Sequence, residues 1–224
     1  MSILFMGDPH GDFQPAIRKA EEFRPEALIL LGDQQPEASL DRIVRDISCP
    51  VWWILGNHDS DQPHYLKNHF SHWDFNLGNR VVEIAGTRIA GLGGEFRQEV
   101  WHPWDGEGRP KWNRRQDYLT SLAPDQGLEG PFPDNCFQKG LPLRGWTAIF
   151  PEDLGILFDQ GPADILVSHA APDWHQYGFK EINDLAEVLE VKTIVHGHLH
   201  RDREITLDNG IRVISLDRGS HFLI

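Results

Sequence analysis

Short apolar runs recur along the chain, and most are bounded by glycine, proline or polar residues, a pattern typical of buried β-strands. We predict nine strands, over residues 3–6, 27–31, 51–55, 80–84, 87–92, 165–167, 193–195, 204–207 and 211–216. Ala85-Gly86 and Asp208-Asn209-Gly210 each separate two of these runs, and such residues accept positive φ, so both pairs are predicted to be hairpins.

Between the strands, apolar residues recur at the i, i+3, i+4, i+7 spacing of a helix with one buried face. Four such helices are predicted, over 13–23, 40–47, 154–158 and 182–189. The N-terminal third therefore alternates as βαβαβ, which implies parallel strands joined by right-handed crossovers.

Residues 94–150 interrupt this alternation. Thirteen of these 57 residues are proline or glycine, against 36 of 224 in the whole chain. The segment also carries four of the eight tryptophans, which argues against plain disorder. We interpret it as a packed, cap-like insertion with one helix near 111–122, within a single domain spanning 1–224. The tryptophans favour a small core of their own over stacking on a nucleobase.

The net charge of the chain indicates which classes of partner it can bind. The chain has 21 lysines and arginines against 34 aspartates and glutamates, a formal charge of −13. Long nucleic acid, which needs a basic face, is therefore disfavoured as a partner, whereas a small anionic substrate depends on local charge. Two cysteines in no metal-binding spacing exclude a cysteine zinc site. The first residues show no secretion signal and no run is long enough to span a membrane, so we expect a cytoplasmic protein.

Metal-ligand residue types follow five of the predicted strands. Because ligands of an open α/β sheet bind outside the carboxyl ends of its strands, these side chains should meet in one crevice. Glycine before or within these groups lets the backbone approach an ion closely. The residues are Asp8 and His10, Asp33, Asn57, His169, and His198 with His200.

The ordered set D-x-H, G-D, G-N-H-D, H and G-H-x-H resembles the calcineurin-like metallophosphoesterase superfamily, and it extends from Asp8 to His200. The resemblance implies a four-layer α/β/β/α sandwich holding two divalent ions. It assigns Asp8, His10, Asp33 and His200 to one ion, and Asp33, Asn57, His169 and His198 to the other, so that Asp33 bridges. Nitrogen and oxygen ligands without a thiolate suit Mn, Fe, Ni, Co or Zn, and the sequence does not choose among them.

The expected function is hydrolysis of a small phosphomonoester or phosphodiester by a metal-bridging hydroxide. His58 resembles the family's proton donor to the leaving group, although it could also only bind the phosphate. Asp59 either orients a histidine or serves as a turn or N-cap residue. Two alternatives stay open: a nuclease acting on DNA or RNA, and a non-catalytic interaction scaffold. Monoester or diester preference and oligomeric state are not predicted.

The loop from Gly32 to Glu37 departs from the pattern. Many superfamily members carry G-D-x-x-D there, whereas this chain reads Gly-Asp-Gln-Gln-Pro-Glu. This counts against a eukaryotic-type protein phosphatase and leaves the partner of His58 unidentified. Arg97, Arg114 and Arg115 could clamp phosphate, but solvation at the surface is the favoured interpretation.

Overall fold

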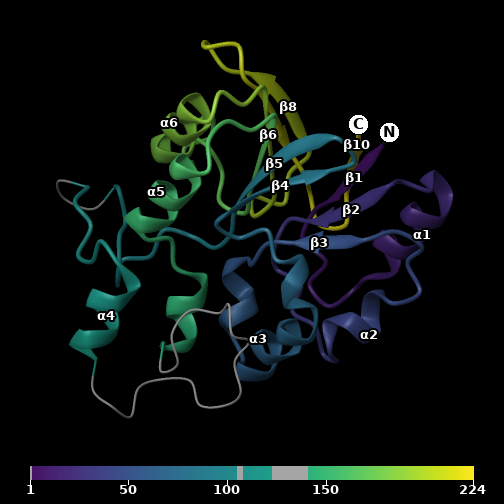
Figure 1. The fold of residues 1–224 in the computed structure, drawn as a ribbon, viewed down its shortest axis with the longest axis horizontal. Coiled ribbons are helices and arrows are strands. Elements are labelled where there is room, and N and C mark those ends of the chain that lie inside the picture. The colour runs from purple at the N-terminus through teal and green to yellow at the C-terminus, as the bar shows by residue number, and fades with distance from the viewer. Residues whose placement is uncertain (1, 105–107, 123–140) are drawn as a thin grey trace.

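The computed structural model describes residues 2–104, 108–122 and 141–224, which form two sheets with helices outside them (Figure 1). The first sheet has the order β10 (His221–Leu223), β1 (Ile3–Met6), β2 (Ala27–Leu30), β3 (Val51–Trp53). The second has the order β4 (Arg80–Ile84), β5 (Thr87–Leu92), β6 (Ile165–Ser168), β7 (Thr193–His196), β9 (Arg212–Ser215), β8 (Arg203–Thr206).

Alternating side chains of the buried strands supply two different cores. In β1, Ile3 and Phe5 join a cluster that contains residues of both sheets, whereas Leu4 and Met6 face the helices. In β6, Val167 lies in the same inter-sheet cluster, and Leu166 belongs to a third cluster on the outer face. A two-residue period buried on both faces explains why these strands are continuously apolar.

Helices cover both outer faces. The core outside the first sheet includes residues of α1 (Gln14–Phe23) and α2 (Leu40–Val44), and the core outside the second includes residues of α5 (Pro151–Asp159) and α6 (Lys180–Val188). The predicted α/β/β/α layering is therefore confirmed. None of the helices in the described residues has the length and apolarity needed to cross a membrane.

The predicted strand pattern is largely confirmed. β1, β2 and β3 pair in parallel, and β4 and β5 form a hairpin in which Ala85 and Gly86 have φ of 48° and 74°. Among the described residues, one α-helix and one strand were missed, besides three short 3-10 helices: α3 (Pro63–His69), and β10, which pairs antiparallel with β1. β10 has three residues, too few for a periodic signal, and its pairing partner is far away in sequence.

The prediction that the tryptophans of 94–150 form a small core of their own is wrong. Trp101 belongs to the core outside the second sheet and Trp146 to the core outside the first, while Trp104 is 46% exposed. The predicted helix is present as α4 (Arg115–Ser121). Residues 105–107 and 123–140 lie outside the described part of the chain, and the role of the insertion as a cap stays a prediction.

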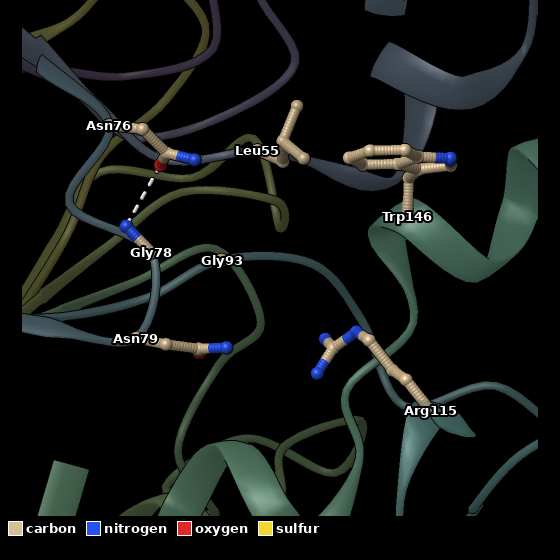
Figure 2. Close-up of a pocket in the computed structure, with 7 residues that line it drawn as sticks. All are labelled: Leu55, Asn76, Gly78, Asn79, Gly93, Arg115 and Trp146. Carbon is tan, nitrogen blue, oxygen red and sulfur yellow. Dashed lines mark hydrogen bonds between the residues drawn. The ribbon is translucent and has the colours of Figure 1, made fainter. Parts of the chain in front are cut away.

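Arg115 joins this insertion to the second sheet's helices. Its guanidinium is buried, pairs with the carboxylates of Asp153 and Glu152 on α5, and lies 4.5 Å from the ring centroid of Phe150. Figure 2 shows Arg115 and Asn79 pointing toward one another across a small cavity, and the Asn79 amide also donates to Asp153. Arg115 thus has a structural role, and neither interpretation made from the sequence, surface solvation or a phosphate clamp, fits this burial.

The buried side chain of His69 should make the free energy of unfolding depend on pH in the acidic range. Its ring is fully buried beside Trp53, and burial lowers the pKa of His69 to about 4. The unfolded chain protonates this histidine near its ordinary pKa of 6.5, whereas the folded chain does not. The free energy of unfolding should therefore fall as pH drops from 6.5 to 4, with His69 contributing about 3 kcal/mol. Urea unfolding of chelator-treated protein at several pH values should show a shallower fall in His69→Gln. An identical pH dependence in both proteins would contradict this assignment.

Candidate metal centre

The five predicted strand ends converge. Because each set of strands is parallel, β1, β2 and β3 end at one edge of the first sheet, and β6 and β7 end at one edge of the second. Contacts of Asn57 and Asp33 with His169 bring these two edges together. The loops that follow these ends bring together all seven residues singled out from the sequence: Asp8, His10, Asp33, Asn57, His169, His198 and His200.

Four of the seven form one compact group. A ligand atom from each of Asp8, His10, Asp33 and His200 lies within 4.8 Å of the others, so the group could hold a metal ion. The Nε2 atoms of His10 and His200 are 2.9 Å apart, and Nε2 of His200 is 3.3 Å from Oδ2 of Asp8.

A second group adjoins the first through Asp33. Oδ1 of Asn57 lies 2.9 Å from both Nε2 of His169 and Nδ1 of His198. Oδ2 of Asp33 is 3.4 Å from Nε2 of His169 and 3.8 Å from Nε2 of His10. One carboxylate oxygen therefore faces both groups, as a bridging ligand would.

The backbone is strained where these side chains are presented. Nine described non-glycine residues have positive φ, a conformation that L-residues adopt at a cost. Five of them belong to the loops of this site: His10, Asp33, Gln35, His198 and His200. Such clustering is typical of functional sites, where the surrounding structure holds the strained conformation.

Glycine is required for two of the close approaches. A Cβ on Gly197 would lie 2.1 Å from Oδ1 of Asp8, and one on Gly56 would lie 2.2 Å from Oδ1 of Asp33. Any larger residue would displace a carboxylate of the site. Glycine therefore lets the backbone approach these two carboxylates, while its close approach to an ion stays a prediction.

Two hydrogen bonds orient the imidazoles. Nδ1 of His169 donates to the carbonyl oxygen of Leu31 at 2.8 Å, and Nδ1 of His10 is 2.7 Å from Oε1 of Gln35. In these tautomers the Nε2 lone pairs point into the site. Gln35 was not predicted as a site residue, and no sequence pattern distinguishes it from Gln34.

The donor set fits divalent cations. When the His169 ring is neutral with its proton on Nδ1, as metal binding requires, Nε2 and Oδ1 of Asn57 are both acceptors and lie 2.9 Å apart. Oδ1 of Asp8 is buried and has no hydrogen-bond partner among the described residues. A cation between such atoms satisfies them, and the nitrogen and oxygen set suits a transition metal.

The pKa values of two site histidines in the metal-free protein also indicate a site for cations. Burial disfavours the charged imidazole of His169, but the carboxylates of Asp33 and Asp8 raise the pKa of His169 to about 10. Burial and the charge on His169 lower the pKa of His198 to about 3. The acidic centre thus attracts one positive charge even without ions, and bound metals would displace that proton.

His58 lies beside the first group but outside the two ligand sets. Its ring centroid is 5.6 Å from that of His10, and its backbone N–H donates to Oδ1 of Asp33 at 2.8 Å. Its Nδ1 is 2.6 Å from Oδ2 of Asp61. Asp61 is therefore the partner of His58 that the sequence left unidentified.

Asp59 is buried behind the site. Its carboxylate accepts from the backbone N–H groups of Gly56 at 2.8 Å and Gln35 at 2.7 Å. Burial and the nearby charge of Asp33 raise the pKa of Asp59 to about 8. These contacts match the turn and capping role, and they also tie the loop after β3 to the loop after β2.

The end of β5 adds two residues to the surroundings of the site. Oε1 of Glu95 lies 3.5 Å from Nε2 of His198, and Nη2 of Arg97 donates to the carbonyl oxygen of Asn57 at 3.0 Å. Arg97 is buried, so the favoured prediction of surface solvation is wrong for it, while the exposed Arg114 pairs with Asp117. Gly93-Gly94 before Glu95 repeats the strand-then-glycine signal and could have identified this sixth strand end.

Known proteins resemble this chain over most of its length. The family model described as calcineurin-like phosphoesterase matches residues 1–202. A Haemophilus influenzae protein, described only as uncharacterized, is 42% identical over 204 residues, which are 89% of this chain and 84% of that protein.

Solved structures share the fold. The protein TT1561 of Thermus thermophilus has a TM-score of 0.60 and 18% identity, with 98% of this chain and 90% of that chain covered. A Danio rerio dimetal phosphatase has a TM-score of 0.54 and 14% identity, with 98% and 88% covered. A Mycobacterium tuberculosis phosphopantetheinyl hydrolase has a TM-score of 0.54 and 18% identity, with 97% and 90% covered.

Proposed function

We propose that this chain, which belongs to the calcineurin-like phosphoesterase family, hydrolyses a small phosphomonoester or phosphodiester with two divalent transition-metal ions. Family membership makes it a metal-dependent hydrolase. The observation that carries the finer proposal is the position of Asp33, whose Oδ2 faces His10 on one side and His169 on the other.

The proposed ligands fall into two groups of side chains, one for each ion. Asp33 belongs to both groups and would serve both ions. The first ion would be held by Asp8, His10, Asp33 and His200, and the second by Asp33, Asn57, His169 and His198. When bound, such ions supply an activated water and stabilise the charge on the phosphoryl oxygens.

The charge of the ligand set favours an anionic substrate. Asp8 and Asp33 are its carboxylates, and the remaining ligands are imidazoles and one amide. Two divalent ions would therefore leave the centre positive within a chain of net charge −13. This local charge, rather than the overall sum, governs attraction of a phosphate group.

The exposed side of the centre indicates where substrate enters. The His200 side chain is 42% exposed and the His58 side chain 45%, whereas His169 is fully buried. His58 and His200 are therefore accessible to a phosphate ester approaching from this side. We propose that His58 donates the proton from Nε2 to the leaving oxygen.

The substrate is proposed to be small. Long nucleic acid would meet an acidic protein, and one solved structure of the same fold bears the name of a phosphopantetheinyl hydrolase. Small phosphorylated metabolites are therefore the class to test first, with oligonucleotides as the comparison.

Reconstitution with metal tests this function. Chelator-treated protein reloaded separately with Mn, Fe, Co, Ni or Zn should bind about two ions per chain and hydrolyse p-nitrophenyl phosphate or its bis ester. A panel of phosphorylated metabolites, dinucleotides and oligonucleotides then ranks substrates. Metal-loaded protein that turns over none of these would support the scaffold alternative. Preference for oligonucleotides with steep salt dependence would support the nuclease.

A further inference from the structure

The geometry points to Asp61 as the residue that positions His58 for proton donation, an inference that rests on the proposed function. Oδ2 of Asp61 accepts from Nδ1 of His58 at 2.6 Å. This contact leaves Nε2, the other ring nitrogen, available to a substrate. Hydrolysis of esters with poor leaving groups should therefore depend on Asp61.

The two residues belong to one short turn. His58 lies in η1 (Asn57–Ser60), and Asp61 follows directly, with its backbone N–H donating to the carbonyl oxygen of His58 at 3.0 Å. The carboxylate and the imidazole are thus held at an i, i+3 spacing by the backbone itself. No second loop has to move into place to complete the pair.

The turn is anchored to the metal centre at several points. The His58 N–H donates to Asp33, and the carbonyl oxygen of Asn57 accepts from Arg97 and from Oγ of Ser60 at 3.2 Å. The position of the His58 backbone is therefore fixed relative to the proposed ligands. What the backbone leaves free is rotation of the imidazole, and the Asp61 contact restricts it.

Glu37, an acidic residue on the loop after β2, contacts side chains of α3. The Glu37 carboxylate lies 3.2 Å from Nε2 of His64 and accepts from the hydroxyl of Tyr65 at 3.1 Å, both on α3. It supplies a matched control, since it is an exposed acid on the loop after β2 that contacts a different histidine.

The chemical step predicts which substrates need Asp61. The oxygen of water forms a bond to phosphorus, one proton of that water passes to solvent, and the bond from phosphorus to the ester oxygen breaks. The electron pair stays on that oxygen, which takes the proton from Nε2 of His58. His58 is left neutral with Nδ1–H on Asp61, and it regains a proton from solvent. A p-nitrophenolate leaves without that proton, whereas an alkoxide requires it.

Asp61→Ala tests the role by comparing two leaving groups. In metal-loaded protein, kcat for an alkyl phosphate ester should fall about 10- to 100-fold, and by a clearly smaller factor for the p-nitrophenyl ester. Glu37→Ala should leave the ratio of the two rates unchanged. In a His58→Gln background, Asp61→Ala should add little, because the two residues act as a unit. Metal content should stay at the wild-type level in each variant.

A second measurement reports on the imidazole directly. Long-range ¹H–¹⁵N spectra of the zinc-loaded protein, recorded at a pH where the His58 ring is neutral, should show the Nδ1–H tautomer, and Asp61→Ala should shift the neutral ring toward the Nε2–H form. An unchanged tautomer, equal losses on both esters, or the same loss without His58 would each overturn the inference. Absence of turnover by the wild-type protein on every ester would overturn the proposed function and this inference with it.

Discussion

Asp33→Asn is expected to lower kcat by about a thousandfold or more, because it weakens both proposed metal positions at once. Oδ2 of Asp33 faces both His10 and His169, and Oδ1 accepts from the His58 backbone. An amide keeps the shape but removes the negative charge. The variant should bind fewer metal ions than the wild-type protein, measured by elemental analysis after gel filtration, with kcat measured at saturating metal.

Asp208→Asn is the matched control for this substitution. Asp208 lies in the exposed turn between β8 and β9, so the same loss of charge occurs far from the site. It should keep the wild-type metal content and rate. Full activity of Asp33→Asn, or retention of both ions at wild-type affinity, would refute the bridging assignment.

His58→Gln is expected to keep the metals and lower kcat by about a hundredfold. Neither proposed ligand set contains His58, so the substitution removes no metal ligand. Glutamine can still donate a hydrogen bond to a phosphate, but it supplies no proton at neutral pH. The loss should therefore be larger for alkyl esters than for aryl esters.

The same substitution at His64 provides the comparison. His64 is an exposed histidine of α3 that contacts Glu37, and His64→Gln should leave kcat near the wild-type value. If His58→Gln lost its metals, His58 would be a ligand rather than a proton donor. If His58→Gln kept full activity, His58 would at most contact the phosphate, and turnover would not require that contact.

The local pattern foresaw most strands but not every helix or pairing. Runs such as Ile3–Met6 are buried on both faces, so their sequence is apolar without interruption and easily recognised. α3 was missed because its sequence, from Pro63 to His69, has few apolar residues at helical spacing. Burial of His69 against Trp53 depends on a contact between distant segments.

The ligand set was foreseeable because parallel strands end at one edge of a sheet. Parallel pairing brings the ends of β1, β2 and β3 together in one sheet and those of β6 and β7 together in the other. That step needs only the order of strands and the residue types after them, whereas packing of the two sheets brought their edges together. The packing of the insertion could not be predicted. Trp101 and Trp146 pack into different cores, and the linear sequence does not define which residues form each core.

By itself, the sequence located the strands and the candidate ligands after them, because an apolar run and the glycine and polar residues that follow it are local properties. The four layers followed from the family resemblance of those motifs. Only the tertiary structure decided which atoms face each other. It paired His58 with Asp61, set the tautomer of His10 through Gln35, and placed Arg97 behind Asn57. Hydrogen-bond partners depend on side-chain rotamers and on loops brought together from different strands. Neither leaves a periodic trace along the chain.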